Sequence, residues 1–152
     1  MKHGQFYHYE LYGRENSKAI KKKNSSLYTI LGEAFREQEY SKHVNKEDTD
    51  KFPPKIVFGM EFDENISENE KLILQKEKLI EMAEKYAKSK HLRKIDGCIL
   101  AGVVSYPPGT SIEDHSKIQN ELVLPYLNEK WGVNLRCVIS HYDEYFWDDK
   151  KK

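Results

Sequence analysis

The sequence has few cysteines and no long apolar run. It has 152 residues and only two cysteines, Cys98 and Cys137, too few for a disulfide scaffold or a zinc finger. Because each stands in an apolar segment, we expect small buried thiols. No run of about 18 apolar residues occurs, and the N-terminal residues lack the apolar core of a secretory signal. We therefore expect a cytoplasmic protein that does not enter a membrane.

Net charge and several familiar catalytic motifs are also missing. The 25 basic and 25 acidic residues cancel, which argues against a strongly basic protein that attaches non-specifically to nucleic acid. No glycine-rich phosphate loop, Gly-x-Ser-x-Gly turn, Walker pattern or Cys-x-x-Cys pair is present. These absences argue against an enzyme driven by nucleotide hydrolysis, a serine hydrolase and a zinc ribbon.

The hydrophobic pattern predicts one domain in which strands and helices alternate. Alternating or continuous apolar residues indicate strands over 4–12, 55–59, 97–106 and 135–142, and apolar stripes at helical spacing indicate helices over 25–40, 67–91 and 111–132. Ser67 with Glu70 forms a capping box for the second helix, and Pro125 is expected to kink the third. This order predicts an α/β fold (an α+β sandwich) with helices packed on a central, mainly antiparallel sheet.

The predicted helices carry clear apolar stripes. In the first, the stripe comprises Leu27, Ile30, Leu31, Ala34 and Phe35, with Ser25 or Asn24 as the cap. In the second, it comprises Leu72, Ile73, Leu79, Ile80, Ala83, Tyr86 and Ala87. These residues are expected to form the core, and the charged residues between them a solvated surface.

Two clusters of residues could carry chemistry. The first, residues 7–14, combines tyrosines, an acid, a glycine and Arg14, and a tyrosine can attack a phosphodiester if a base takes its proton. Arg14 and the distant His141 could assist, although the local pattern favours half-buried strand tyrosines as the explanation of the cluster. Next to it, a stretch with Lys18, Lys21, Lys22 and Lys23 could contact a nucleic-acid backbone or form a solvated loop.

The second cluster is His141-Tyr142-Asp143-Glu144, at the end of the last predicted strand. Imidazole and carboxylate groups suit a divalent metal or an acid–base pair. The alternative is a strand end followed by a solvated acidic turn. No second histidine follows Glu144, and a selective metal site needs at least three ligands.

Three stretches together resemble the N-terminal relaxase domain of plasmid mobilisation (Mob) proteins. They are residues 8–14, then 32–36 with His43-Val44 and 53–59, and finally 127–144, which is the most similar. Relaxases of this kind nick one DNA strand at a transfer origin and stay attached to its 5′ phosphate through a tyrosine. The resemblance implies the same reaction on single-stranded origin DNA, together with accessory proteins of a plasmid transfer assembly.

The resemblance also implies roles for individual residues. His141 matches the first metal-binding histidine, and Glu144 matches an acidic residue in or near the metal shell, where Mn²⁺ or Mg²⁺ would bind. Tyr12 lies where these enzymes supply the nucleophile, with Tyr28 and Tyr9 as alternatives. Arg14 would hold a phosphate, and the lysines at 21, 22 and 23 are the expected DNA contacts.

The sequence departs from the family pattern after Glu144. The His-hydrophobic-His pair of the family is missing, so two of three expected metal ligands are absent. We therefore expect an incomplete relaxase-like domain over 1–144 with a polar tail over 145–152, and weak or no nicking. The alternatives are a non-catalytic module that binds DNA or a partner protein, and an α/β domain unrelated to DNA.

Overall fold

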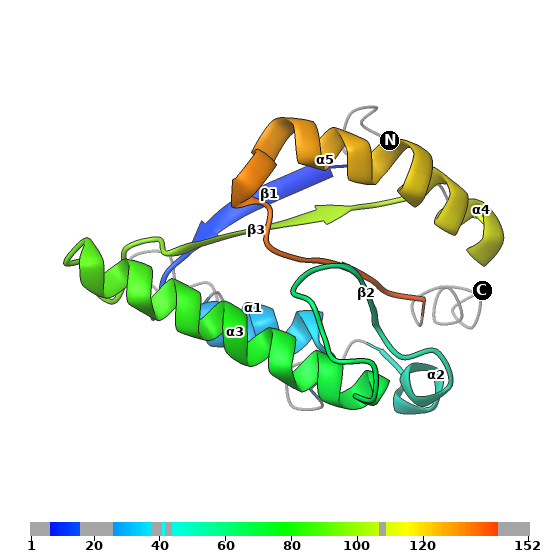
Figure 1. The fold of residues 1–152 in the computed structure, drawn as a ribbon, viewed down its shortest axis with the longest axis horizontal. Helices are drawn as coiled ribbons and strands as arrows, with labels where there is room; N and C mark the ends of the chain where they lie inside the picture. Colours follow the sequence, from blue (N-terminus) through cyan, green and yellow to red (C-terminus); the bar gives the residue numbers. More distant parts are fainter. Residues whose placement is uncertain (1–6, 16–25, 38–40, 42–43, 107–108, 143–152) are drawn as a thin grey trace.

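The computed structural model describes residues 7–15, 26–37, 41, 44–106 and 109–142 (Figure 1). The strands are β1 (Tyr7–Tyr12), β2 (Lys55–Phe58), β3 (Ile99–Val104) and β4 (Val138–Ser140). The helices are α1 (Leu27–Ala34), α2 (Lys46–Lys51), α3 (Glu68–Ser89), α4 (Ile112–Ile118) and α5 (Leu124–Trp131), with a π-helical turn over Gln119–Val123 and a 3-10 turn over Gly132–Asn134. The predicted α+β fold is confirmed.

The strands pair as two small antiparallel sheets within the described residues. β1 pairs with β3 from Tyr7↔Val104 to Tyr12↔Ile99, and β2 pairs with β4. The prediction of one central sheet is therefore wrong for the described part of the chain. The last strand is also shorter than predicted, because β2 offers only four residues and its register shifts between Ile56 and Phe58.

Helices cover both faces of the β1–β3 sheet (Figure 1). On one side lie α1 and α3, whose Leu27, Leu31, Phe35, Leu79 and Ala83 form the buried core. Ile99 of β3 packs against this core. On the other side lie α4 and α5, where Trp131 contacts the Tyr9 ring edge to face at a centroid distance of 5.4 Å. The two faces of β1 therefore have different neighbours.

The helix starts follow the capping rules. Ser67 accepts a hydrogen bond from the Glu70 amide at 3.2 Å, and Ser111 accepts one from the Asp114 amide at 3.0 Å. The cap of α1 is Ser26 rather than the expected Ser25 or Asn24, since its hydroxyl accepts from the Thr29 amide. These bonds satisfy backbone donors that have no partner within the helix.

Three predictions about the helices are corrected. The buried face of α3 is formed by Gln75, Leu79, Ala83 and Ala87, while Ile73 and Tyr86 are about half exposed. A short helix, α2, was not expected; Asn45 caps it by accepting from the Glu47 amide at 2.8 Å. Instead of a kink, the helix widens into the π turn before Pro125, which relieves the clash of a proline ring with the preceding turn.

Gly13 joins β1 to α1 through a contact that leaves no room for a side chain. A Cβ at this position would lie 2.8 Å from the carbonyl oxygens of Ile95 and Asp96. The Gly13 carbonyl also accepts from the Leu27 amide at 2.7 Å. Residue 13 must therefore be glycine for these backbones to approach.

We expect Gly13→Ala to lower the free energy of unfolding by about 1–3 kcal/mol, because backbone atoms must move to accommodate the methyl group. Gly97→Ala is the matched control: its Cβ meets only the Leu11 side chain, at 3.1 Å or more, and that side chain is exposed. Urea unfolding of both variants measures the difference. Equal losses would contradict the role given to Gly13.

Candidate functional site

Three polar side chains form a row along one face of β1. They belong to His8, Glu10 and Tyr12, which the period of two in a strand places on the same face. The Tyr12 hydroxyl donates to Glu10 Oε2 at 3.1 Å, and His8 Nε2 lies 3.2 Å from Glu10 Oε1. A phenol, a carboxylate and an imidazole are thus linked in sequence, the arrangement of a nucleophile, its base and a group that orients the base.

The Tyr12 phenol is held in its neutral form. Burial raises the pKa of Tyr12 above its ordinary value of 10.0, and the hydrogen bond to Glu10 and the negative charges of Glu10 and Glu33 raise it further. At neutral pH this phenol is therefore protonated, and it needs a base to become a nucleophile. Glu10 is already in hydrogen-bond contact with that proton.

His141 lies directly after β4 and contacts the end of α1. Its Nε2 donates to the Ala34 carbonyl at 2.7 Å. The proton therefore resides on Nε2, and only Nδ1 could act as a metal ligand. Metal-binding histidines commonly donate their other ring N–H to a backbone carbonyl in this way, so the side chain by itself suits the role that the resemblance implies.

Helix α1 contacts the first and the third of the resembling stretches, since the Leu27 amide donates to the Gly13 carbonyl and the Ala34 carbonyl accepts from His141. Glu33 is near enough to raise the pKa of Tyr12 by its charge, and the next residue, Ala34, accepts the hydrogen bond from His141. Glu33 and Ala34 belong to the second stretch, Tyr12 to the first and His141 to the third. The backbone that follows Tyr12 therefore lies at the start of α1, and His141 lies at its end.

The described residues do not fit a divalent metal as a set. Across 7–15, 26–37, 41, 44–106 and 109–142, no group of three His, Cys, Asp or Glu side chains is placed to hold one. His141 supplies one imidazole, and a selective site needs more ligands. The predicted acidic partner Glu144 lies outside the described residues.

Arg14 is engaged by the protein itself. Its Nη2 donates to the Leu92 carbonyl at 2.7 Å, its Nη1 lies 3.6 Å from Glu84 Oε1, and its side chain is only 12% exposed. This arrangement ties the end of β1 to the segment after α3. Binding of a phosphate by Arg14 stays a prediction. The guanidinium would have to bind the phosphate in addition to Leu92 and Glu84, or in place of them.

The two alternative tyrosines have different surroundings from Tyr12. Tyr28 donates to Glu84, and this hydrogen bond, with burial and the charge of Glu84, raises its pKa to about 12. Tyr9 lies on the other face of β1 against Trp131, with the Lys130 ammonium 4.9 Å from its ring centroid. Among the three, only Tyr12 belongs to the row with Glu10 and His8.

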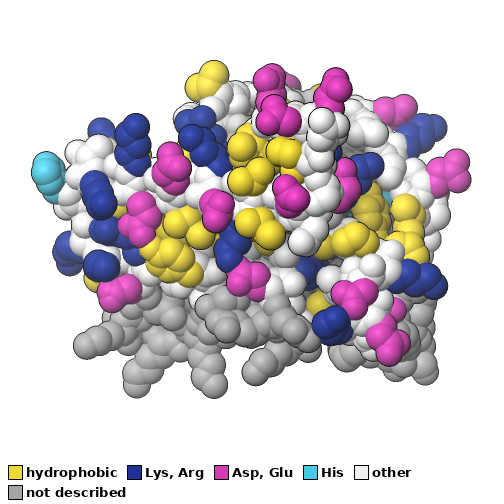
Figure 2. Space-filling view, turned by 60° about the horizontal axis from the view of Figure 1, so that its bottom comes forward, with side chains coloured by type: hydrophobic (Ala, Val, Ile, Leu, Met, Phe, Trp, Pro, Cys, Tyr) yellow, Lys and Arg dark blue, Asp and Glu magenta, His cyan; other side chains and the backbone are white. Residues whose placement is uncertain are grey.

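The remaining predicted DNA contacts cannot be placed. Lys21, Lys22 and Lys23 lie outside the described residues. On the face that Figure 2 shows, lysine and arginine side chains gather mainly at the left, and acidic and apolar side chains are mixed over the centre.

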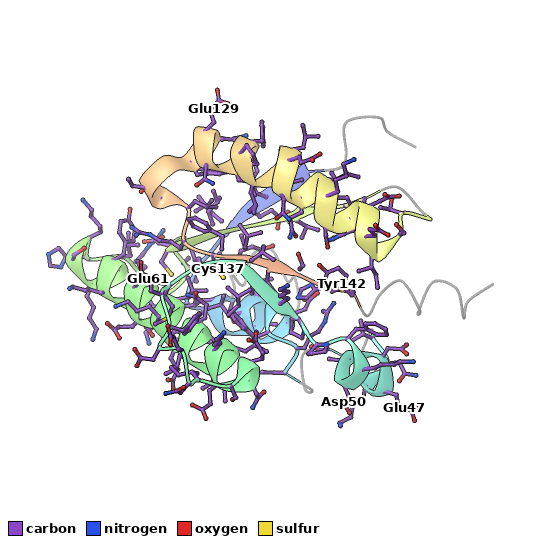
Figure 3. All side chains as sticks on the ribbon, turned by 45° about the vertical axis from the view of Figure 1, so that its right-hand side comes forward. Glu47, Asp50, Glu61, Glu129, Cys137 and Tyr142 are labelled. Atoms are coloured by element: carbon purple, nitrogen blue, oxygen red, sulfur yellow. The ribbon has the colours of Figure 1, made fainter. Side chains whose placement is uncertain are left out.

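The cysteines pack against the core but are less buried than predicted. Both are free and half-buried, and both pack against the core of α1 and α3. Cys137 lies on the segment that leads into β4, and Tyr142 lies beyond the end of that strand (Figure 3). Burial raises the pKa of the Cys137 thiol to about 12, so this group is neither a thiolate nucleophile nor a ready metal ligand.

A buried histidine gives the fold a measurable pH dependence. His115 is 5% exposed and packs between the rings of Tyr106 and Tyr142, at centroid distances of 4.0 and 5.0 Å. Burial lowers its pKa below the ordinary 6.5, so the unfolded chain takes up this proton before the folded chain does. We expect stability to fall as the pH drops below 6.5.

Urea unfolding at about pH 7 and about pH 5 tests this effect. The variant His115→Phe keeps a ring between the two tyrosines but removes the titrating group. We expect its stability to change less between the two pH values than that of the wild type. An identical pH dependence in both proteins would show that His115 contributes nothing to it.

Sequence reasoning missed part of the candidate site. The sequence alone indicates Glu10 and His8 as neighbours in a tyrosine-rich strand, and it suggests the distant His141 as the base. The signal was present as the spacing His8-x-Glu10-x-Tyr12, which on a strand places three side chains on one face. The contribution of Glu33 has no sequence signal, because it depends on how α1 packs beside β1.

Comparison with models of protein families, with curated proteins and with solved structures found no match to this chain. Among the described residues, no helix is long and apolar enough to span a lipid bilayer.

Proposed function

We propose that this chain is a relaxase-like domain of the plasmid mobilisation kind, which acts in the cytoplasm on single-stranded DNA at a transfer origin. The observation that carries the proposal is the hydrogen bond from Tyr12 to Glu10, with His8 beside it. The hydrogen bond that the His141 ring donates to the Ala34 carbonyl supports it further, because metal-binding histidines commonly donate their other ring N–H in this way. Both tyrosine and histidine are residues that the resemblance had singled out.

The proposed reaction is a transesterification. Tyr12 Oη attacks a DNA phosphorus while its proton passes to Glu10, and the bond from that phosphorus to the 3′ oxygen breaks. The 3′ oxygen leaves and takes up a proton from water, while the 5′ phosphate stays bound to Tyr12. No external energy source is needed, because the phosphodiester bond is exchanged for a phosphotyrosyl bond of the same kind.

His8 has a positioning role in this proposal. Its ring contacts the oxygen of Glu10 that does not face Tyr12, and so it orients the carboxylate toward the phenol. No step is derived through a metal, because the described residues do not provide a set of ligands.

A second candidate function is a non-catalytic module that binds origin DNA or a partner protein of a transfer or replication assembly. The engagement of Arg14 by Leu92 and Glu84 favours it, since this leaves no ready cation at Tyr12. In that case Tyr12 and Glu10 would only stabilise the strand surface.

A search for covalent attachment separates the two functions. The wild-type protein is incubated with a pool of random single-stranded DNA, in parallel with Mn²⁺, with Mg²⁺ and with a chelator, and then denatured. A DNA adduct that survives denaturation supports the relaxase-like function. Salt-sensitive binding without an adduct supports a DNA-binding module. Absence of any DNA binding at low salt contradicts both the relaxase-like function and a DNA-binding module.

A further inference from the structure

A hollow lies between β2 and the start of α3, apart from the row on β1. Its volume is about 310 Å³, at the lower end of the range for sites that bind small ligands. Its walls are the strand, the turn after it and the first turns of the helix, through Lys55, Ile56, Val57, Phe58, Gly59, Met60, Phe62, Glu68 and Lys71. The proposed reaction uses none of these residues.

The backbone around this hollow is fixed by two features. The register between β2 and β4 shifts between Ile56 and Phe58, so Val57 forms a bulge, and bulges re-aim side chains where a strand borders a site. Beyond it, the Met60 amide donates at 2.9 Å to the side chain of Gln75, which is 2% exposed. A Cβ at Gly59 would collide with that same Gln75 oxygen, so a larger residue there would displace the Gln75 side chain from its hydrogen bond to Met60.

The lining combines aromatic rings with basic groups. The rings of Phe58 and Phe62 are half-buried, and the Lys71 ammonium lies 5.9 Å from the Phe62 ring centroid and 2.9 Å from Glu68. Lys55 is exposed and forms no ion pair with another residue in the described ranges. Because Lys71 already neutralises Glu68, the charge left on the rim is positive.

We infer that this hollow receives one unpaired base of a single DNA strand, which stacks on Phe62 while Lys55 contacts a neighbouring phosphate. The rings suit any base because every base presents a π face, and the exposed lysine suits the phosphate. The volume accepts a single base, whereas a duplex does not enter such a space. The inference rests on the proposed function, since it names a contact to the same class of substrate.

Binding of a fluorescein-labelled, random-sequence single-stranded DNA to the whole chain tests this inference by anisotropy. We expect Phe62→Ala to weaken binding about tenfold, and Phe62→Tyr to keep it. Lys55→Glu should make the plot of log affinity against log salt less steep, by an amount that corresponds to about one phosphate contact or more. The matched controls are Phe52→Ala, another half-buried ring with a lysine 5.7 Å from its centroid, and Lys85→Glu on the exposed side of α3.

Crosslinking gives a second readout that does not depend on the stability of a variant. With 5-iodouracil in place of thymine in the same DNA, irradiation of the wild type should attach a base to the tryptic peptide 56–71, which contains both Phe58 and Phe62. Crosslinks confined to other peptides would overturn the inference, and so would Phe62 and Lys55 variants that bind like their controls. Adduct formation tests the proposed function separately. If the wild type forms the adduct but the Phe62 and Lys55 variants bind DNA like their controls, the base-binding hollow is refuted and the proposed function is not.

Discussion

Tyr12→Phe is expected to abolish covalent attachment to DNA, and Glu10→Gln to slow it by about a hundredfold to ten-thousandfold, the usual contribution of a positioned base. The phenylalanine removes the attacking oxygen together with its hydrogen bond to Glu10. The aromatic ring stays in place. The glutamine keeps the shape of Glu10 but cannot take the phenolic proton. Gel quantification of the DNA adduct after denaturation measures both effects.

Tyr9→Phe is the matched control for this prediction. Tyr9 lies on the same strand but faces Trp131 on the opposite side of the sheet, so loss of its hydroxyl should leave the adduct unchanged. A Tyr12→Phe protein that still forms the adduct, or a Tyr9→Phe protein that fails to form it, would contradict the assignment of the nucleophile.

Leu27→Ala is expected to lower the free energy of unfolding by about 2–5 kcal/mol. Leu27 is fully buried at the first turn of α1, in the core shared with α3. Truncation removes apolar contacts and leaves a cavity that rigid neighbours cannot fill. Because α1 also carries Glu33 and Ala34, we expect DNA attachment to weaken as the helix loosens.

The control for this prediction is Leu122→Ala. Leu122 is 68% exposed on the π turn, and substitutions at such surface positions change stability by about 0.5 kcal/mol or less. Urea unfolding followed by circular dichroism compares the two variants. Equal losses would show that the core is not centred on α1 and α3.

Elements with strong local signals were predictable from the sequence. Ser67 with Glu70, and Ser111 with an acidic first turn, mark helix starts because the capping bonds are local. The apolar run around Ile99 gave β3. In contrast, Gln75 was not expected in the core, because a buried amide becomes favourable only when the turn at Met60 supplies its hydrogen bond.

The pairing of strands and the composition of the site were less predictable. Nothing in the sequence indicates that β2 bulges at Val57, or that β3 and β4 belong to different ladders within the described residues. The role of Arg14 likewise depends on Leu92, 78 residues away. Such contacts are set by tertiary packing. In contrast, the period of two along β1 is enough to predict that Glu10 and Tyr12 lie on the same face of the strand.

The most direct test of the central claim is to locate the nucleotide on the protein by mass spectrometry. After the adduct is digested with trypsin and nuclease, the peptide 3–14 contains Tyr7, Tyr9 and Tyr12, and fragmentation distinguishes them. The account predicts a nucleotide phosphate on Tyr12 alone. A nucleotide on Tyr28 or Tyr9, or DNA that binds without any modified tyrosine, would contradict it.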